Sequence, residues 1–244
     1  MIKIRNISKL FNGKTVLQDF TLNIDENRFY TIMGPNGCGK STLLNIIAGI
    51  LEKDSGEICR EIDELKIGYV WQDYRSSLFP WLSITENISF PFKVKGVSSK
   101  ERKAKVQNLI GEFGIDLNIK DKIYNLSGGQ QQLVSILRAM IIMPNLFLLD
   151  EPFSALDQYI RWQIGFNLEK MWLKHKSSVL FVSHDVDEAI LLADEIILIN
   201  KNGRIEKILT NVMPRSRTKD MMTSREHIVH KNEIVEFLFE QTKR

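Results

Sequence analysis

Hydrophobic and polar residues alternate with a period of two from the start of the chain to about Ile62. This pattern is typical of strands that bury one face, and turn signals at Asn12-Gly13 and Ser55-Gly56 interrupt it. Residues 28–33 form a short aromatic and β-branched run within this stretch, which predicts a further strand. We therefore expect an antiparallel β region that flanks this strand.

The pattern becomes helical after residue 72 and stays helical to about residue 143. Ser83 with Glu86, and Ser98 with Glu101, have the spacing of a capping box at a helix N-terminus. Gly114 is placed to end the second of these helices. We predict a helical subdomain at about 73–143, inserted into an α/β core.

The core resumes with a continuous apolar run at residues 146–150, which is typical of a central parallel strand. Strands alternate with helices along this half of the chain, so the fold class is predicted to be α/β. The other expected elements are a strand at 66–70, a long helix after Asp157, a strand at 178–182, a helix opened by Asp185 and a hairpin at Asn202-Gly203.

A last segment, residues 209–244, follows the domain that we place at 1–208. Its predicted helix has a strongly apolar face made by Ile234, Val235, Phe237, Leu238 and Phe239. We expect this face to pack on the protein's own core. A regulatory contact or a dimer contact is the alternative.

A phosphate-binding loop follows the strand at 28–33 and precedes an apolar, helix-permissive run. It satisfies the G-x-x-x-x-G-K-[ST] template, in which backbone amides and a helix N-terminus converge on an anion. Lys40 would reach the β- and γ-phosphates, and the Ser41 hydroxyl would bind Mg²⁺. The predicted nucleotide-binding residues here are Gly34, Pro35, Asn36, Gly37, Cys38, Gly39, Lys40, Ser41 and Thr42.

Two carboxylates, Asp150 and Glu151, end the apolar strand at 146–150, and Pro152 follows them. Asp150 is placed to organise a magnesium shell, and Glu151 to polarise an attacking water. A solvated acidic turn is the alternative, but the lysine loop upstream favours a catalytic role.

A second glycine-rich loop, Leu126-Ser127-Gly128-Gly129-Gln130, lies between these two patterns. With all three in this order, the chain resembles the ATP-binding cassette (ABC) family, specifically the ATP-binding subunits of transporters, over about residues 2–208. The resemblance implies the ABC ATPase fold: a P-loop NTPase core with a flanking antiparallel β region and an inserted helical subdomain. It also implies that two copies share two ATP sites. Ser127, Gly128, Gly129 and Gln130 of one copy would then face the γ-phosphate held by Lys40 of the other.

The resemblance extends to four further positions. Gln72 is similar to the family's Q-loop residue, which contacts Mg²⁺ and the water, and His184 in Ser183-His184-Asp185 is similar to the switch histidine. Asp157 lies in a D-loop-like stretch, Ser154-Ala155-Leu156-Asp157. Phe11 sits where the family places an aromatic ring against adenine, and we expect it to stack there; a packed strand residue is the alternative.

One position departs from the family pattern. Leu133 stands where the family usually has a basic residue, whereas Arg138, the other usual arginine of that helix, is present. The change would weaken polar support for the helix or let a neighbour pack there. It removes no group that touches phosphate.

Composition adds several exclusions. The chain has 244 residues, 33 basic against 30 acidic, which gives no strong nucleic-acid signal. The sequence contains no run of about 18 apolar residues, so we expect no membrane-spanning segment. Two cysteines argue against a disulfide scaffold, and amides and Lys40 would lower the pKa of the Cys38 thiol. A basic cluster, Arg215, Arg217, Lys219 and Arg225, is expected to be a solvated surface, with contact to anionic lipid or a membrane partner as the alternative.

The implied function is ATP hydrolysis that powers a membrane transporter, with ATP and Mg²⁺ as cofactors. The implied partners are a second copy, a membrane permease and a solute-binding protein, at the cytoplasmic face of the membrane, and no nucleic acid. The sequence Phe79-Pro80-Trp81 resembles the corresponding stretch in importers of nitrate, sulfonate, taurine or pyrimidine precursors. Trp81 would be either a contact for the permease or a core residue. A soluble ABC-type ATPase acting on nucleic acid or ribosomes is the alternative function, although such relatives carry long coiled-coil inserts or two cassettes.

Overall fold

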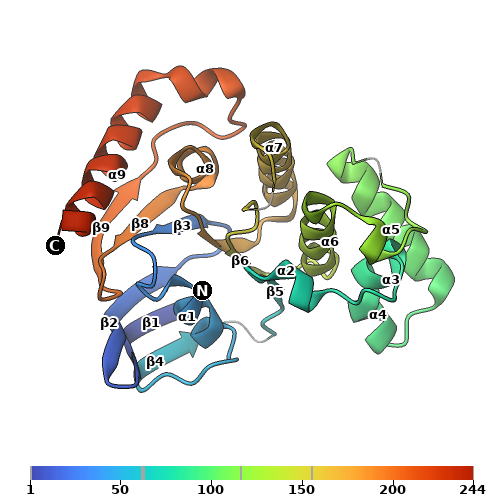
Figure 1. The fold of residues 1–244 in the computed structure, drawn as a ribbon, viewed down its shortest axis with the longest axis horizontal. Coiled ribbons are helices and arrows are strands. Elements are labelled where there is room, and N and C mark those ends of the chain that lie inside the picture. Colours follow the sequence, from blue (N-terminus) through green and yellow to red (C-terminus); the bar gives the residue numbers. More distant parts are fainter. Residues whose placement is uncertain (1, 62–63, 116, 155, 244) are drawn as a thin grey trace.

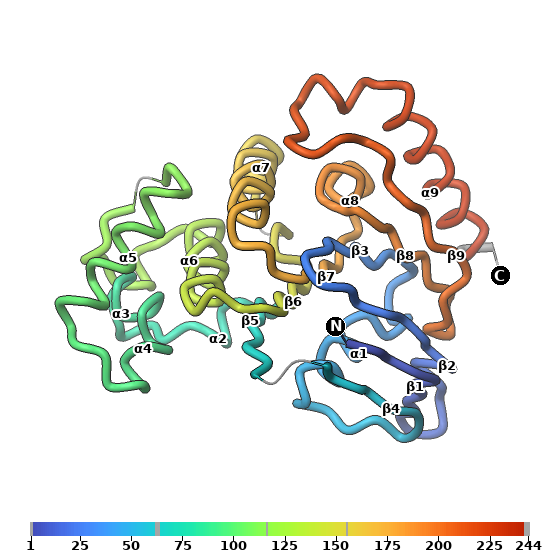
Figure 2. Tube along the Cα trace, turned by 180° about the vertical axis from the view of Figure 1, so that it is seen from behind, coloured from blue at the N-terminus to red at the C-terminus, as the bar shows by residue number. Residues whose placement is uncertain are grey.

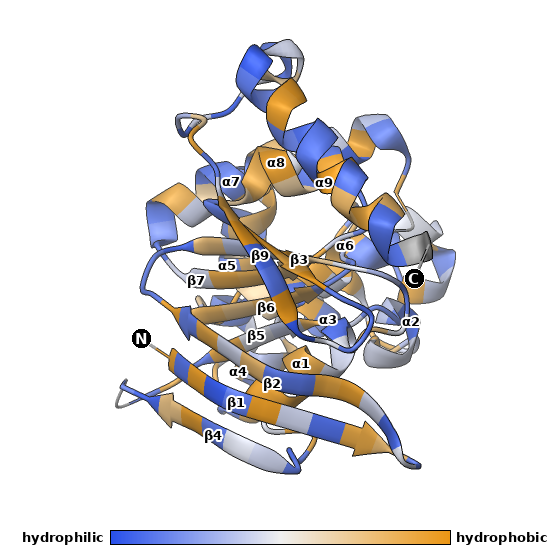
Figure 3. Ribbon diagram, turned by 90° about the vertical axis from the view of Figure 1, so that its left-hand side faces the viewer, coloured by the Kyte–Doolittle hydropathy of each residue, from blue (hydrophilic) through white to orange (hydrophobic). Residues whose placement is uncertain are grey.

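A computed structural model describes residues 2–61, 64–115, 117–154 and 156–243. Its larger sheet has six strands in the order β5-β6-β7-β3-β8-β9, all parallel except β9. Their bounds are Ile67–Val70, Leu146–Asp150, Ser178–Val182, Phe29–Met33, Glu195–Ile199 and Ile205–Thr210. The strands β3 and β6 are buried on both faces, as the continuous apolar sequence of β6 predicts, and β6 is largely orange in Figure 3.

A second, antiparallel sheet has the order β2-β1-β4, with bounds Lys14–Ile24, Ile2–Phe11 and Ser55–Arg60. Helix α1, Lys40–Ile47, lies between the two sheets, because its Leu43 and Leu44 share one apolar cluster with residues of both. The predicted antiparallel region is therefore confirmed. The predicted turn at Ser55-Gly56 is wrong, because both residues begin β4.

Gly56 explains that error. It has φ +86°, and a Cβ atom there would lie 2.4 Å from the carbonyl oxygens of Arg5 and Asn6 on the neighbouring strand. The ladder between β1 and β4 shifts register at this point. The sequence pattern predicts a turn at this glycine. In the structure, the missing side chain instead permits close contact between β4 and β1.

The helices between residues 74 and 140 gather at one end of the molecule, away from the antiparallel sheet (Figure 1). The capping box at Ser83 and the cap at Ser98 both form, and Gly114 ends α5 in the left-handed conformation. Of the helices in the part of the chain described here, none is long and apolar enough to cross a membrane. The helices of this region are α2 (Tyr74–Ser77), α3 (Ile84–Ile88), α4 (Phe90–Val94), α5 (Ser99–Phe113), η1 (Ile123–Asn125) and α6 (Gly128–Met140).

The remaining helices cover the face of the large sheet opposite α1. Helix α8, Val186–Leu192, lies between α7, Gln158–His175, and the C-terminal helix α9, Arg225–Lys243, in the views of both Figures 1 and 2. Ile234 of α9 is buried in an apolar cluster with Ala189 and Ile190 of α8. A short helix, η2, at Lys219–Thr223 precedes α9.

Candidate active site

Polar residues gather at the carboxyl ends of four adjacent strands of the large sheet. The order β5-β6-β7-β3 brings together Gln72 after β5, Asp150 and Glu151 at β6, His184 after β7 and the phosphate loop after β3. Carboxyl ends of parallel strands are where α/β sheets bind ligands. The strand order therefore brings the predicted residues together. No single sequence pattern predicts this order.

The phosphate loop, residues 34–42, joins β3 to the N-terminus of α1. Gly39 is the N-cap of α1 with φ +95°, and a Cβ atom there would lie 2.6 Å from the carbonyl oxygen of Val16. The first turn of α1 has no acidic residue, which leaves its positive end available to an anion. Lys40 Nζ lies over the loop, 2.8 Å from the carbonyl oxygen of Gly34 and 2.9 Å from that of Pro35.

Asp150 is buried at the end of β6, 3% exposed, and lines a neighbouring cavity together with Ser41 and Gln72. Burial raises the pKa of its carboxyl group, and a hydrogen bond with the Ser41 hydroxyl partly offsets this effect. Its Oδ1 atom has no hydrogen-bond partner among the described residues. An unpartnered carboxylate oxygen beside a hydroxyl suits a hard cation, so Asp150, Ser41 and Gln72 fit the oxygen ligands that Mg²⁺ prefers.

Glu151 is held by two neighbours. Gln72 Nε2 donates to its Oε2 atom at 3.0 Å, and His184 Nε2 lies 2.5 Å from its Oε1 atom. Its own backbone is in the left-handed region, with φ +49°, a strained conformation for glutamate that is typical of functional positions. The side chain is 10% exposed, whereas that of His184 is 49% exposed and open to a ligand.

A cavity of about 300 Å³ lies over the phosphate loop and is lined by Lys40, Ser41, Gln72, Glu151 and His184 among others. None of its described lining residues belongs to the loop at 126–130. Ser127 instead caps α6: its Oγ accepts from the amide of Gln130, and Gln130 Oε1 accepts from the amide of Ser127. The Ser127–Gln130 spacing is a capping box that the sequence reasoning missed, although the S-x-x-Q pattern contains it.

The remaining predicted residues lie around this centre. Asp157 caps α7 by accepting from the amide of Ile160 at 3.0 Å, and Ala155 of the same loop lies outside the described residues. Phe11 ends β1, is 43% exposed and does not line the cavity over the loop. Leu133 is 6% exposed within the main apolar cluster, so it packs where a basic residue was expected.

Cys38 corrects one expectation. The thiol is buried, and burial raises its pKa, while the nearby Lys40 charge opposes this only in part. The prediction of a lowered pKa was therefore wrong. The sequence indicated the loop amides and Lys40 but gave no measure of the burial.

A second polar cluster beside Glu151 and His184 was not predicted. Arg161 of α7 donates to the Leu156 carbonyl at 3.1 Å and pairs with Asp185 at 3.1 Å and Glu188 at 3.3 Å. Burial raises the pKa of Glu188 to about 7. Asp185 lies 24 residues from Arg161, and Glu188 lies further along the chain, so no local pattern could have predicted these ion pairs.

Comparison with known proteins defines the class. The family model described as ABC transporter matches residues 17–154, more than half of the chain. The chain therefore belongs to the ABC transporter family, and it is an ATPase that hydrolyses ATP to drive transport.

The particular relatives are ATP-binding proteins and cassettes. The chain is 38% identical to the aliphatic sulfonates import ATP-binding protein SsuB of Bacillus cereus, over 90% of this chain and 89% of that protein. It is 37% identical to the spermidine/putrescine import ATP-binding protein PotA of Clostridium novyi (strain NT), over 86% of this chain and 62% of that protein. Its fold matches a dimeric post-hydrolysis structure of the ATP-binding cassette MJ0796 bound to ADP and Pi, with TM-score 0.78 and 31% identity over 88% of this chain and all of that chain.

Proposed function

We propose that this ATPase works as a pair of identical chains, which hold two ATP molecules between them and drive the import of a small solute. The proposal depends on the separation of Ser127 from the other site residues within one chain. Lys40 and Glu151 line the cavity over the phosphate loop, whereas Ser127 stands apart from it at the N-terminus of α6. A second copy, packed head to tail, would supply the missing Ser127, and the dimeric MJ0796 cassette supports this arrangement.

In this scheme residues 1–208 form the ATPase domain, with the helical subdomain at about 73–143. Phe11 stacks on adenine, and the loop amides with Lys40 neutralise phosphate charge. Ser41, Gln72 and Asp150 would hold Mg²⁺, which supplies further charge neutralisation when bound. The other proposed nucleotide contacts are Gly34, Pro35, Asn36, Gly37, Cys38, Gly39 and Thr42, with Gly128, Gly129, Gln130 and Asp157 of the second copy.

Glu151 then orients the attacking water and receives its proton as the water oxygen bonds to the γ-phosphorus and the bond from that phosphorus to the β–γ bridging oxygen breaks, which releases ADP. Gln72 and His184 contact its two carboxylate oxygens, and these contacts fix the direction in which the carboxylate points. Positioning of this kind, together with the electrostatic stabilisation from the loop amides and Lys40, accounts for most of the catalysis in phosphoryl transfer to water.

Mixing two inactive variants tests the shared site. Lys40→Ala removes the lysine from one half of a site, and Ser127→Arg blocks the other half. In a mixed pair, the Ser127→Arg chain supplies Lys40 and the Lys40→Ala chain supplies Ser127, so one of the two sites is intact. Random pairing predicts that the mixture regains up to about one quarter of the unmodified turnover, while each variant alone stays nearly inactive.

The Lys40→Ala/Ser127→Arg double variant is the matched control, because mixing it with either single variant restores no intact site. A mixture of single variants that is no faster than the sum of its parts would contradict the shared site. Full activity of Ser127→Arg alone would contradict it as well.

We infer that a membrane permease docks beside Trp81 and holds the protein at the cytoplasmic face of the membrane. Trp81 is 68% exposed, so the alternative of a buried core tryptophan is wrong. Its ring lies 5.8 Å from that of Phe79, which lines a cavity of about 340 Å³ together with Phe90 and Arg138. An exposed aromatic beside an apolar cavity is typical of an interface anchor.

Trp81→Ala tests this docking surface. The variant should keep the ATPase activity of the free protein and lose copurification with a multi-spanning membrane protein. Tyr124→Ala is the control, because Tyr124 is also 68% exposed. Equal loss of copurification in both variants would contradict a specific anchor at Trp81.

For the solute, we propose the sulfonate, nitrate and taurine class, with a solute-binding protein as a further partner. The 38% identity to an aliphatic sulfonate import protein and the Phe79-Pro80-Trp81 wording support this class. The 37% identity to a spermidine/putrescine import protein supports small-solute import but does not favour the sulfonate, nitrate and taurine class. Taurine uptake by vesicles containing the copurified permease would test the class, and spermidine uptake instead would overturn it.

A further inference from the structure

Helix α8 begins two residues after the proposed switch histidine and has only seven residues. A helix this short is not stable on its own in water, so its position depends on what packs around it. Its N-terminus carries the turn that presents His184: Asp185 caps the helix, and the Asp185 amide donates to Ser183 Oγ at 2.9 Å. Movement of α8 would therefore move His184 relative to Glu151.

The C-terminal segment, residues 211–243, contacts the first turn of α8 through Asp187. Lys231 of α9 lies 2.8 and 2.9 Å from the two Asp187 carboxylate oxygens, and His227 Nε2 lies 2.8 Å from Oδ1. The pKa of Asp187 is lowered, because hydrogen bonds from Lys231 and His227 outweigh its burial. Asp187 is three residues after His184, less than one helical turn away.

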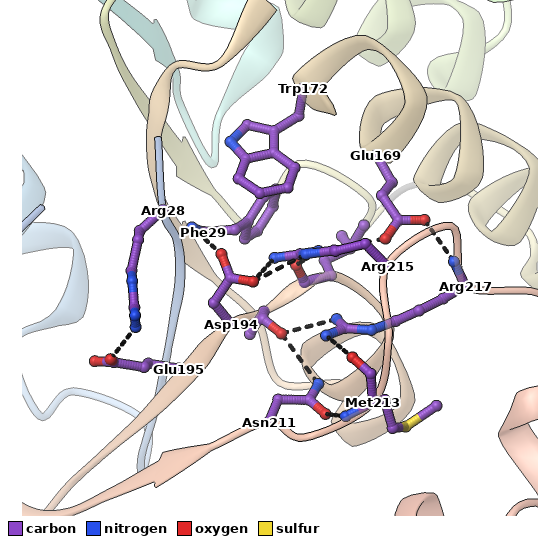
Figure 4. A network of polar contacts seen from close by, with 12 residues as sticks. Arg28, Phe29, Glu169, Trp172, Asp194, Glu195, Asn211, Met213, Arg215 and Arg217 are labelled. Carbon is purple, nitrogen blue, oxygen red and sulfur yellow. Dashed lines mark hydrogen bonds and ion pairs between the residues drawn. The ribbon is translucent and has the colours of Figure 1, made fainter. Parts of the chain in front are cut away.

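The same segment also holds the other end of α8 (Figure 4). The Arg217 guanidinium donates to the carbonyl oxygens of Ile190, Leu191 and Ala193 at 3.1, 2.9 and 2.8 Å. Arg215 donates to the Leu192 carbonyl at 2.8 Å and pairs with Asp194 and Glu169. The expectation that this basic cluster is a solvated surface, or a contact for lipid, is wrong for these two arginines, since Arg217 is 3% exposed and both bind protein groups. Lys219 and Arg225 are exposed.

We propose that residues 211–243 position the switch histidine for hydrolysis by holding α8 at both ends, with Lys231 and His227 as positioning residues. This inference rests on the proposed role of His184 in the site. The segment acts on the ATPase through one rigid path, from α9 to Asp187, along the first turn of α8, to the turn at His184 and Glu151.

Lys231→Met removes one ion pair of this path at a side chain that is 45% exposed. Lys207→Met is the matched control: Lys207 of β9 is 50% exposed, and its ion pair is with Glu233 of α9 and not with a residue of α8. Lys231→Met should lower kcat about fivefold with little change in KM for ATP, the scale of one ion pair lost at the transition state. Lys231→Arg should restore kcat, because a guanidinium also binds a carboxylate.

Both Met variants should unfold at similar urea concentrations. If the ion pair had only a structural role, kcat would therefore change equally in the two variants. Equal kcat in Lys231→Met and Lys207→Met would overturn the proposal. Failure of Lys231→Arg to recover activity would do the same.

A double-mutant cycle separates this inference from the role of His184. In the His184→Ala background, Lys231→Met should have no further effect on kcat, because the group that it positions is gone. An undiminished fivefold effect in that background would overturn the proposed path. If His184→Ala alone leaves kcat unchanged, the assignment of His184 itself fails.

Discussion

Arg217 offers a stability test whose size follows from its contacts. Its guanidinium donates to four carbonyl oxygens, three at the end of α8 and that of Met213 at 3.0 Å. Nη1 makes three of these contacts with only two hydrogens, so the four contacts amount to about three hydrogen bonds; at about 1.5 kcal/mol for each bond from a charged donor, they contribute about 4.5 kcal/mol. Burial opposes this gain, because it lowers the pKa of Arg217 from 12.5 to about 10. A shift of that size corresponds to a cost of about 3 kcal/mol.

Arg217→Met should therefore lower the free energy of unfolding by about 1 to 2 kcal/mol. Methionine keeps much of the apolar volume and removes the guanidinium donor, while Asn211 still donates to the Ile190 and Ala193 carbonyl oxygens. Urea unfolding followed by circular dichroism measures the change, with Arg204→Met as the control because Arg204 is exposed. If the two variants were equally stable, the guanidinium would not be what holds the end of α8.

Two further predictions concern titratable groups. The folded-state pKa of Glu188 is about 7 against an ordinary value of 4.5, so the folded protein holds a proton that the unfolded chain releases. The free energy of unfolding should fall by about 3 kcal/mol as the pH rises from about 4.5 through 7. Glu188→Gln should remove this pH dependence, as measured by urea midpoints at pH 5 and pH 8. The same pH dependence in both proteins would refute the prediction. Because burial raises the pKa of Cys38 while Cys59 is exposed, iodoacetamide at neutral pH should label Cys59 at least about ten times faster, as read by peptide mass spectrometry. Faster labelling of Cys38 would indicate that the phosphate loop opens.

Local sequence predicted the elements that carry the site. The phosphate loop, the Asp150-Glu151 strand end and the helix opened by Asp185 all depend on neighbours in the chain, and each element forms where it was expected. Gly56 was misassigned because a glycine between polar residues is typical both of a turn and of a close strand contact, and only the partner strand decides between them.

Long-range pairing could not be predicted in the same way. Arg217 binds carbonyl groups 24 to 27 residues away, and Arg161 binds Asp185 at a separation of 24 residues. A basic residue in a polar stretch has the same local pattern whether it is solvated or buried. Burial and sheet order, which decide between these outcomes, arise only when the chain is folded.

In the proposed mechanism two chains close on ATP, and Glu151 then drives hydrolysis. Glu151→Gln keeps the shape of the side chain and removes its capacity to accept a proton. Light scattering with ATP and Mg²⁺ should give twice the chain mass of 28.3 kDa for this variant, and the single-chain mass without nucleotide. A variant that binds ATP but stays at 28.3 kDa, or that hydrolyses ATP at the unmodified rate, would contradict the account.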